Sequence, residues 1–415
     1  MQRNECPKIR LVSIVFAMLA ILCVGLLYLQ EGQVKPNLKI GVLHSMTGTM
    51  AISERPLVDA LRLAVEEENK AGGIDGRQIE MVIADCRSDA EYCAQQAEKM
   101  IVQERVQAVF GCWTSACRKA VKPVIEKHHH LLFYPVQYEG LEQSPDIIYT
   151  GAAPNQQIIP MALWALQKSG KRFYLIGSDY IFPRTANRMV KDVLLAQGGK
   201  LLGERYLPLG SNELTEVVKE IAAFRPDFVI NTLNGDSNKQ FFRALHEASI
   251  SPEKTPVFST SIAEVELAAM GADLMTGHYA AWNYFQSLAT PENKGFVERF
   301  KQRFGNNRVL DDPMEASYIG VKLWAEVMRN LNTDDLASVK TSLAQQTYLA
   351  PEGVVAIDHD TLHLWKAAYI GRAQADGQFE IVWQTEKPLQ PSPFPGYRSR
   401  AEWISIQQDM LKDQP

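Results

Sequence analysis

Residues 38–73, LKIGVLHSMTGTMAISERPLVDALRLAVEEENKAGG, contain one complete strand–helix unit. The first six residues form a short β-rich run, and a loop of Ser, Thr and Gly follows. Apolar residues then recur at helical spacing, and Gly72-Gly73 ends the helix. The residues on this apolar face are Leu57, Leu61, Ala64 and Val65. The stretch therefore predicts a strand, a loop and a helix with one buried face.

The same order of elements recurs along the chain. Further strands are predicted at residues 79–84, 106–110 and 131–134, with helices at residues 90–104 and 116–127. After a polar stretch at residues 153–157, the alternation restarts, with strands at residues 173–176, 201–206 and 228–232 and helices at residues 158–167, 184–196 and 214–223. Strands that alternate with helices indicate a parallel sheet covered on both faces, so we expect two α/β lobes.

Composition excludes several classes of protein. The 415 residues are 46% hydrophobic and 22% charged, which is ordinary for globular domains. The formal net charge is −5 and no long basic run is present, so nucleic acid is a poor candidate partner. The chain has too few cysteines for a disulfide scaffold and no paired CxxC spacing for structural zinc.

The N-terminal segment predicts the compartment. Residues 11–29 carry no charge and follow Arg3, Lys8 and Arg10, a pattern that predicts export with the rest of the chain outside the cytoplasm. We expect a periplasmic or extracytoplasmic protein tethered to the inner membrane by this segment, because no small-x-small cleavage pattern stands at its distal end. A cleaved signal peptide, or a lipoprotein modified at Cys23, stays open as an alternative.

The loops that follow the predicted strands are the places to seek a site. Open parallel sheets bind ligands at the carboxyl ends of their strands. Two lobes without an obvious catalytic motif suggest a cleft that closes on a small molecule. The loops at residues 44–49, 111–115 and 134–140 belong to the first series of strands, and those at residues 178–180 and 231–238 belong to the second.

Seven motifs carry a family resemblance. They are GCWTS (111–115), FYPVQYEG (133–140), YTGAAPNQQ (149–157), SDYIFPRT (178–185), NGDSN (234–238), AAWNYF (280–285) and DPMEASY (312–318). Together they resemble the urea and short-chain amide branch of the branched-chain-amino-acid-type periplasmic binding proteins, which includes the urea-binding component of ABC transporters. The resemblance runs from about residue 37 to about residue 395.

The resemblance implies the type I periplasmic-binding fold, in which two doubly wound parallel-sheet lobes are joined by three crossovers. The expected divisions are an anchor and linker at residues 1–36, a first lobe at 37–152 and 285–350, a second lobe at 153–284 and 351–395, and a tail at 396–415. A cytoplasmic amide-sensing relative shares many of the motifs, but the hydrophobic N-terminus favours export.

The same loops supply the candidate ligand-binding residues. In the first lobe they are Trp113, Thr114, Ser115, Tyr134, Val136 and Tyr138, and in the second lobe and its connections they are Tyr180, Asn234, Asp236, Glu264 and Tyr284. The resemblance implies that Tyr134 and Tyr180 line an amide pocket and that Ser115 faces a ligand carbonyl. Ser115 and Asp236 also fit helix N-caps, and Glu264 fits a first-turn acid.

Val136 indicates the chemical class of the ligand. Relatives that bind amino acids usually place a hydroxyl residue here to help hold the carboxylate, so an apolar side chain disfavours an amino acid. A neutral planar ligand fits instead, and Trp113 would give it a flat wall.

We therefore expect capture of urea or a short-chain amide in the cleft and delivery to ABC permease subunits, with no metal or organic cofactor. A membrane-tethered amide or urea sensor is an alternative. A Cys-dependent amidase, built from Cys112, Glu139 and Lys119, is the competing enzyme hypothesis. Cys86 and Cys112 follow the second and third strands, so a disulfide between them is possible.

Overall fold

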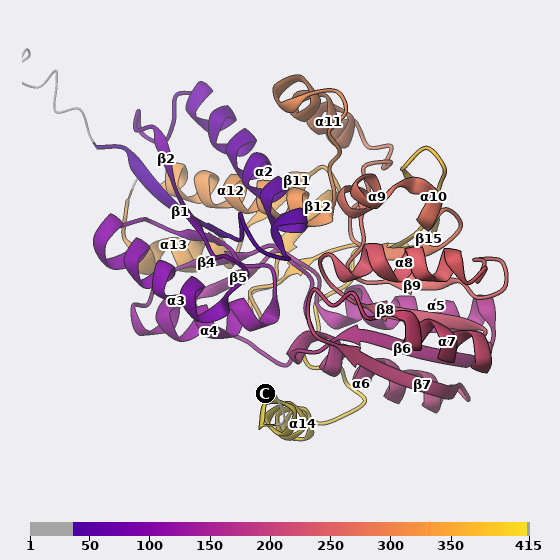
Figure 1. Cartoon of the computed structure of the whole chain (residues 1–415). Coiled ribbons are helices and arrows are strands. Elements are labelled where there is room, and N and C mark those ends of the chain that lie inside the picture. The colour runs from indigo at the N-terminus through magenta and orange to yellow at the C-terminus, as the bar shows by residue number, and fades with distance from the viewer. Residues whose placement is uncertain (1–35, 332, 413–415) are drawn as a thin grey trace, which may run out of the picture. The chain divides into compact units, whose positions relative to one another are not determined.

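The computed structural model describes residues 36–331 and 333–412, and the described residues from Leu38 onward form one compact unit (Figure 1). The expected membrane segment at residues 11–29 lies outside the described residues, so the anchor stays a prediction. Within the described part of the chain, no helix combines the length and the apolarity needed to cross a bilayer. The described strands form three sheets.

The first sheet has the order β2-β1-β3-β4-β5, and its paired strands run parallel. Its strands are β1 (Leu38–His44), β2 (Ile79–Asp85), β3 (Val109–Gly111), β4 (Leu132–Tyr134) and β5 (Ile147–Tyr149). The four strands predicted for this lobe are confirmed, whereas the short strand β5 was missed.

Helices cover both faces of this sheet. They include α2 (Ala51–Lys70), α3 (Ala90–Lys99), α4 (Ser115–Lys127) and α12 (Asp312–Leu331), and a π-helical turn, η1 (Met100–Glu104), extends α3. Figure 1 shows the strands between α2 and α12 on one side and α3 and α4 on the other. Every residue of β3, β4 and β5 is buried. We call this sheet and its helices the first lobe.

The second sheet has the order β15-β14-β10-β9-β8-β6-β7. Its strands are β6 (Arg172–Ser178), β7 (Lys200–Leu207), β8 (Phe228–Thr232), β9 (Val257–Ser259), β10 (Tyr279–Trp282), β14 (Tyr369–Ala373) and β15 (Phe379–Gln384). The pairs from β7 to β10 are parallel, whereas β14 pairs antiparallel with both β10 and β15. The result is a mixed sheet, with the antiparallel strands at one edge.

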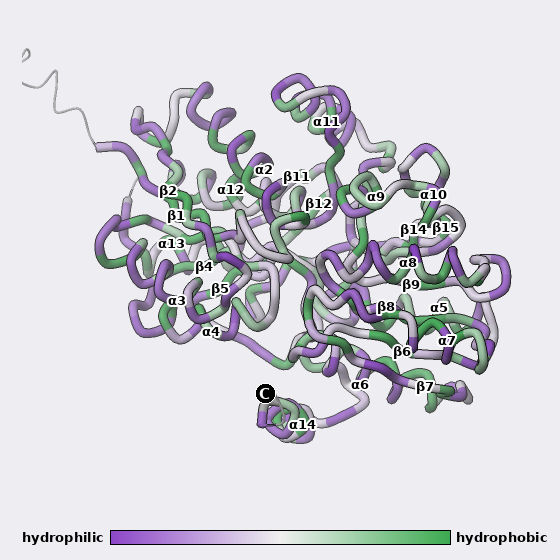
Figure 2. Tube along the Cα trace, in the orientation of Figure 1, coloured by the Kyte–Doolittle hydropathy of each residue, from purple (hydrophilic) through white to green (hydrophobic). Residues whose placement is uncertain are grey.

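The helices of the second sheet are α5 (Ile158–Ser169), α6 (Ile181–Ala196), α7 (Thr215–Phe224), α8 (Ser237–Glu247), α9 (Glu264–Met270) and α10 (Ala272–Met275). Figure 2 shows hydrophobic residues along β6 and β8 and hydrophilic residues on the outer side of α8. This is the pattern of a buried parallel sheet under amphipathic helices. We call this sheet and its helices the second lobe.

A third, antiparallel sheet joins β11 (Thr347–Ala350), β12 (Gly353–Ile357) and β13 (Leu364–Trp365). Its buried residues Val355, Ile357 and Leu364 belong to the core of the first lobe, as does Phe296 of α11 (Pro291–Phe304). The helix α13 (Leu336–Leu343) lies just before this sheet in the chain and packs on the same core through Val339.

The described chain passes between the two lobes at three places. These are residues 150–157 after β5, residues 283–290 after β10, and residues 366–368 between β13 and β14. Three crossovers confirm the predicted topology. Because these connections lie outside both sheets, the lobes can move relative to each other without breaking either sheet.

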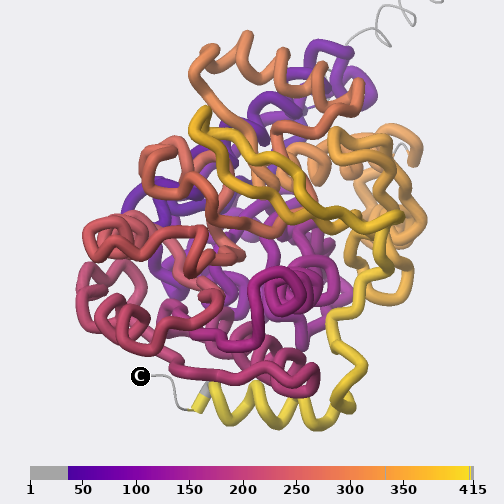
Figure 3. Tube along the Cα trace, turned by 90° about the vertical axis from the view of Figure 1, so that its right-hand side faces the viewer, coloured from indigo at the N-terminus to yellow at the C-terminus, as the bar shows by residue number. Residues whose placement is uncertain are grey.

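The C-terminal residues form a helix where a tail was expected. The helix α14 (Arg400–Lys412) follows a proline-containing strap and lies beside α6, as Figure 3 shows at the lower edge of the molecule. Trp403 is fully buried against Leu141 and Met189, and Arg398 pairs with Asp192 at 2.7 Å. The strap and α14 therefore bridge residues from both lobes.

The disulfide predicted between Cys86 and Cys112 is wrong. The described cysteines form two local bridges, Cys86–Cys93 and Cys112–Cys117. The prediction assumed that β2 and β3 are neighbours, but β1 lies between them in the sheet. Each bridge instead joins the end of a strand to the first turn of the helix that follows it.

Candidate ligand-binding site

Side chains from the two lobes meet at the carboxyl ends of their strands. The indole N–H of Trp113 donates to Asn234 Oδ1 at 3.4 Å, and Gln137 Nε2 donates to the carbonyl of Thr260 at 2.8 Å. The hydroxyl of Ser53 on α2 donates to Glu266 on α9 at 2.6 Å. These hydrogen bonds cross from the first lobe to the second, so the structure is a closed form.

A small cavity lies between the lobes at this edge. Its volume is about 80 Å³, and its lining includes Glu54, Thr114 and Ala116 from the first lobe and Tyr180 and Leu209 from the second. A water molecule needs roughly 10–15 Å³ of such space, whereas pockets for drug-sized ligands begin near about 300 Å³. The cavity therefore suits a solute of a few non-hydrogen atoms.

The N-terminus of α4 supplies hydrogen-bond donors to this cavity. The Thr114 hydroxyl accepts the N–H of Cys117 at 3.1 Å, and so caps the helix. The first N–H groups of a helix, here those of Ser115 and Ala116, have no acceptor within the helix and carry partial positive charge. Gly111 sets the turn that leads here, because a Cβ on it would lie 2.1 Å from the carbonyl oxygen of Leu43.

The second lobe presents a matching helix end. Tyr180 is the residue before α6, and Ala116 in the first turn of α4 packs against the apolar cluster that contains Tyr180 and Ile181. Burial, and then the nearby Tyr134 and Glu139, raise the pKa of Tyr180 well above its ordinary value, so its hydroxyl keeps its proton. Among the described residues this hydroxyl has no hydrogen-bond partner, and Tyr180 lines the cavity.

Glu54 supplies an acceptor on the first-lobe side. Its Oε2 accepts the N–H of Ser45 at 2.8 Å and lies 3.1 Å from His44 Nδ1. Its other oxygen, Oε1, has no partner among the described residues. Of the described residues that line the cavity, none is a lysine or an arginine, while Glu54 and Asp89 are acidic. The lining therefore favours N–H donors over anions.

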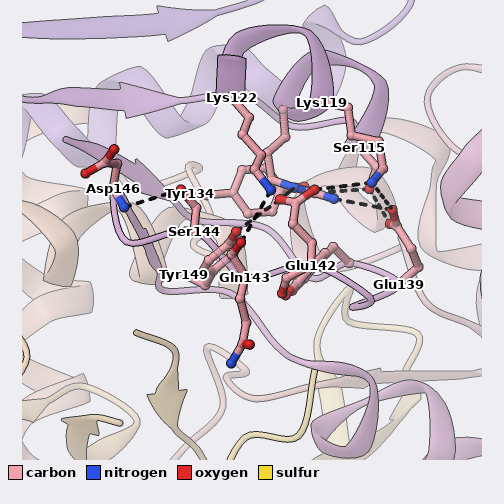
Figure 4. A network of polar contacts seen from close by, with 12 residues as sticks. Ser115, Lys119, Lys122, Tyr134, Glu139, Glu142, Gln143, Ser144, Asp146 and Tyr149 are labelled. Carbon is pink, nitrogen blue, oxygen red and sulfur yellow. Dashed lines mark hydrogen bonds and ion pairs between the residues drawn. The ribbon is translucent and has the colours of Figure 1, made fainter. Parts of the chain in front are cut away.

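A buried ionic network joins α4 to the loop that follows β4 (Figure 4). Ser115 donates to Glu139 Oε2 at 2.5 Å and accepts from Arg118 Nη1 at 3.0 Å. Arg118 also pairs with Glu139 at 3.3 Å and with Glu142 at 2.9 Å. Burial alone would lower the pKa of Arg118, but the charges of Glu142 and Glu139 outweigh burial and raise it. Arg118 is thus a charged residue already neutralised within the protein.

This network fixes the direction of two hydroxyl groups. The proton of Ser115 is committed to Glu139, and Tyr134 donates its own to the carbonyl of Trp113 at 2.6 Å. A hydroxyl whose proton is committed can only accept from a ligand. In this closed form the Ser115 hydroxyl therefore has no proton to give to a ligand carbonyl, and the free N–H groups of α4 remain as donors.

Three other candidates point away from the cavity. Tyr138 contacts His363 Nε2 at 2.5 Å and stacks on Tyr149, so it lies in the core of the first lobe. Tyr284 is fully buried, and it donates to Asn293 at 2.6 Å. Val136 is buried against the backbone at Gly151, where a Cβ would lie 2.2 Å from Val136 atoms.

The two second-lobe acids differ in placement. Asp236 is exposed before α8, and its side chain caps no backbone N–H there. Glu264 is fully buried, and its Oε1 accepts the N–H of Gln286 at 2.7 Å while Oε2 has no partner among the described residues. Burial, with further contributions from Asp312 and Glu266, raises the pKa of Glu264 to about 8. Glu264 thus holds the crossover at residues 283–290 to the start of α9.

The candidate residues did not include Glu54, Ser45 or Leu209, although the loop that contains Ser45 was selected. Glu54 stands in the first turn of the helix that follows the first strand loop, and an acid in that turn was the available signal. Leu209 follows β7, whose loop was not among those selected.

The amidase hypothesis loses its nucleophile. Cys112 is bonded to Cys117, so its sulfur is not a thiol. Glu139 is engaged by Ser115 and Arg118, and Lys119 contacts Glu142 at 3.2 Å.

Residues 38–400 match the family described as a periplasmic binding protein domain. The chain belongs to this family. Membership implies an extracytoplasmic protein that binds a small-molecule solute. The two lobes and their crossovers are thus a type I periplasmic-binding fold, as expected.

Two curated proteins are similar to this chain, one along most of its length and one along a short part. A Leu/Ile/Val-binding protein homolog from Brucella melitensis is 23% identical over 346 residues, which cover 81% of this chain and 88% of that protein. A protein named limonene hydroxylase from Geobacillus stearothermophilus is 36% identical over 124 residues, but the match covers only 30% of this chain and 23% of that protein.

Solved structures share the fold of this family member. A solute-binding protein of an ABC transporter from R. palustris, in complex with 4-hydroxybenzoate, has a TM-score of 0.78 and 22% identity, covering 86% of this chain and 98% of that chain. A branched-chain amino acid transporter protein from Streptococcus pneumoniae, in complex with isoleucine, has a TM-score of 0.76 and 18% identity, covering 86% and 100%.

Proposed function

We propose that this protein captures urea or a short-chain amide in the cleft and delivers it to an ABC permease. The observation that carries the proposal is the composition of the cavity: about 80 Å³, with an unpartnered oxygen of Glu54 on one side and the N-terminus of α4 on the other. Urea has one carbonyl oxygen and four N–H donors, so it needs donors at one end of its pocket and acceptors at the other.

The charges of the lining support a neutral ligand. A carboxylate in this cavity would face Glu54 without a lysine or arginine among the described lining residues. Burying a charge without a partner is costly, so benzoates and amino acids fit poorly. An amide or urea brings N–H groups to Glu54 and its carbonyl to the N–H groups of Ser115 and Ala116.

Closure around the ligand is the proposed mechanism. Each lobe contributes part of the cavity wall, so the ligand stabilises the closed form over the open form. The closed form would then be the one that the permease recognises.

Isothermal titration calorimetry of the full-length protein, freed of co-purified ligand, tests this proposal. Urea, acetamide, formamide, leucine and 4-hydroxybenzoate are titrated in parallel. We expect one-to-one binding of urea or one of the amides and no heat from the two carboxylates. Binding of leucine or 4-hydroxybenzoate, with silence from urea and both amides, would show the proposal to be wrong.

A matched pair of variants locates the binding. Tyr180→Phe removes the unpartnered hydroxyl from the cavity and should weaken binding by roughly fivefold, because a hydrogen bond contributes about 1 kcal/mol. Tyr348→Phe, in the third sheet and outside the cavity lining, should leave the affinity unchanged.

A further inference from the structure

The four described cysteines gather beside the cavity. Cys86 directly follows β2 and Cys112 directly follows β3, while Cys93 and Cys117 lie in the first turns of α3 and α4. The two disulfides lie next to each other, with 3.1 Å between the sulfurs of Cys93 and Cys117. The sulfurs of Cys86, Cys93 and Cys117 all lie within 4.8 Å of one another.

A sulfur at such a distance from a neighbouring disulfide is in position to attack it once it becomes a thiolate. Disulfides exchange by attack of a thiolate on a sulfur, through a mixed disulfide. Cys93 and Cys117 lie at helix N-termini, where the partial positive charge stabilises a thiolate.

We propose that these cysteines form a thiol–disulfide relay, in which one dithiol converts the two local bridges into a single Cys93–Cys117 bridge and two thiols, at Cys86 and Cys112. The relay is a redox modification site in the wall of the cleft. It does not depend on which solute the cleft binds.

The steps balance through either entry point. A dithiol thiolate attacks Cys86, the Cys86–Cys93 bond breaks, and the Cys93 thiolate attacks Cys117 and expels Cys112 as a thiolate. The second thiol of the reductant then resolves the mixed disulfide at Cys86. The reductant loses two electrons and two protons as it becomes a disulfide, and Cys86 and Cys112 gain them as thiols.

Attack at Cys117 leads to the same product. Cys112 then leaves first, the second thiol of the reductant resolves the mixed disulfide, and the Cys117 thiolate attacks Cys93 and expels Cys86. Both routes give the same product because each includes attack between the sulfurs of Cys93 and Cys117, which lie 3.1 Å apart.

The product bridge is favoured by chain length. It closes a sequence separation of 24 residues, against 7 and 5 for the two bridges in the structure. In the chain-entropy account, a bridge across a longer loop constrains the unfolded chain more and stabilises the fold more. A protein left with one disulfide should therefore keep this one.

Access to the relay runs through the cleft. Cys86 and Cys117 line the cavity opposite Tyr180 and Leu209 of the second lobe, whereas Cys93 and Cys112 are fully buried. A reductant therefore reaches the relay when the lobes separate. After exchange, the first turns of α3 and α4 are covalently joined and the Cys86 thiol stands in the cavity wall.

Limited reduction of the full-length protein tests the relay. One equivalent of dithiothreitol is added, thiols are alkylated, and tryptic peptides are mapped by mass spectrometry without further reduction. Trypsin separates Cys86 (residues 78–87) from Cys93 (residues 88–99), and leaves Cys112 and Cys117 together in residues 106–118.

We expect peptide 88–99 bonded to peptide 106–118, which carries one alkyl group on Cys112, and a separately alkylated peptide 78–87. The proposal is overturned if peptide 106–118 keeps its internal disulfide while the other two are alkylated. It is equally overturned if peptides 78–87 and 88–99 stay bonded while 106–118 is alkylated twice.

Two variants that remove the same bridge provide a matched control. Cys86→Ser leaves Cys93 as a thiol 3.1 Å from Cys117, so the isolated protein should contain the Cys93–Cys117 bridge and an alkylatable Cys112 without added reductant. Cys93→Ser should keep Cys112–Cys117 closed. Equal rearrangement in both variants, or in neither, would contradict the relay.

Discussion

Ser53 on α2 donates a hydrogen bond of 2.6 Å to Glu266 on α9, and this bond joins the first lobe to the second. Both residues are buried, with 1% and 2% of their surfaces exposed. Glu266 also accepts the N–H of Ala263 at 3.0 Å, so the same carboxyl group caps α9 and holds α2. One carboxyl group thus contacts both lobes and contributes to the closed form, beside the Trp113–Asn234 and Gln137–Thr260 hydrogen bonds.

Replacement of Ser53 by alanine should weaken ligand binding. The closed form would lose one hydrogen bond and leave Glu266 Oε1 buried without a donor, at a cost of about 1–3 kcal/mol, whereas the open form would lose less. We expect the dissociation constant to rise by roughly tenfold, measured by calorimetry with whichever of urea, acetamide and formamide binds the wild type. Thr341→Ala on α13, which removes a hydroxyl bonded within its own helix, is the control and should change nothing. An unchanged affinity in Ser53→Ala would show that the contact does not support closure.

Glu264 should make stability depend on pH. Burial, with Asp312 and Glu266 nearby, raises the pKa of Glu264 to about 8. Between about pH 5 and pH 8 the folded protein therefore holds a proton that the unfolded chain has already released. The free energy of unfolding should therefore fall as the pH rises through this window.

Glu264→Gln removes that contribution and keeps an acceptor for the N–H of Gln286. Relative to the variant, the wild type should lose roughly 2–5 kcal/mol between pH 5 and pH 9, because each unit of pKa shift corresponds to about 1.4 kcal/mol. Thermal melts of both proteins across this range give the comparison. Parallel curves for the two proteins would mean that Glu264 is not protonated in the fold.

Asn234 and Asp236 are two residues apart and should behave differently. Asn234 is buried and accepts from the Trp113 indole across the cleft, whereas Asp236 is exposed. Asn234→Ala should weaken binding by roughly tenfold through the lost hydrogen bond, while Asp236→Ala should leave the affinity unchanged. Calorimetry on both variants distinguishes them. A larger loss in Asp236→Ala would restore the earlier alternative, in which Asp236 contacts the ligand.

Glu139 should matter more for stability than an exposed acid of the same lobe. Glu139→Gln removes one of the carboxylates that neutralise the fully buried Arg118, and breaking a buried pair costs roughly 3 kcal/mol. Glu98→Gln, which affects solvent-screened contacts to Lys127 and His128, should cost much less. Denaturation by guanidinium chloride measures the free energy of unfolding of both variants. It is used in place of urea because urea is a proposed ligand. Equal losses would mean that Glu142 alone balances Arg118.

Local sequence patterns predicted the long helices and strands but not the shortest strands. The helix α2 and the strands β1 and β8 were predictable because each has a clear apolar period and a polar or glycine boundary. The strands β5 and β9 have three residues each, and their strand character comes from pairing with neighbours. The helix α14 escaped prediction because only a few residues, Trp403 above all, are buried against the rest of the protein.

The candidate site shows the same limit. Thr114 and Tyr180 were expected in the cleft and line the cavity, because both stand where a strand loop leads into a helix. Tyr138 belongs to the same loop motif as Tyr134, yet it points to His363, a residue 225 positions away in the chain. The direction of a side chain in a loop is decided by packing that local sequence does not contain.

The sequence by itself determined that this chain alternates strands and helices, forms two α/β lobes, and places its chemistry in the loops after the strands, because these properties follow from short-range periodicity. Only the tertiary structure decided that β1 separates β2 from β3, and so that Cys86 pairs with Cys93 instead of Cys112. It also brought Glu54 to the cavity and committed the protons of Ser115 and Tyr134 to Glu139 and Trp113. These outcomes depend on strand order and on long-range hydrogen bonds, and both are set only when the whole chain packs.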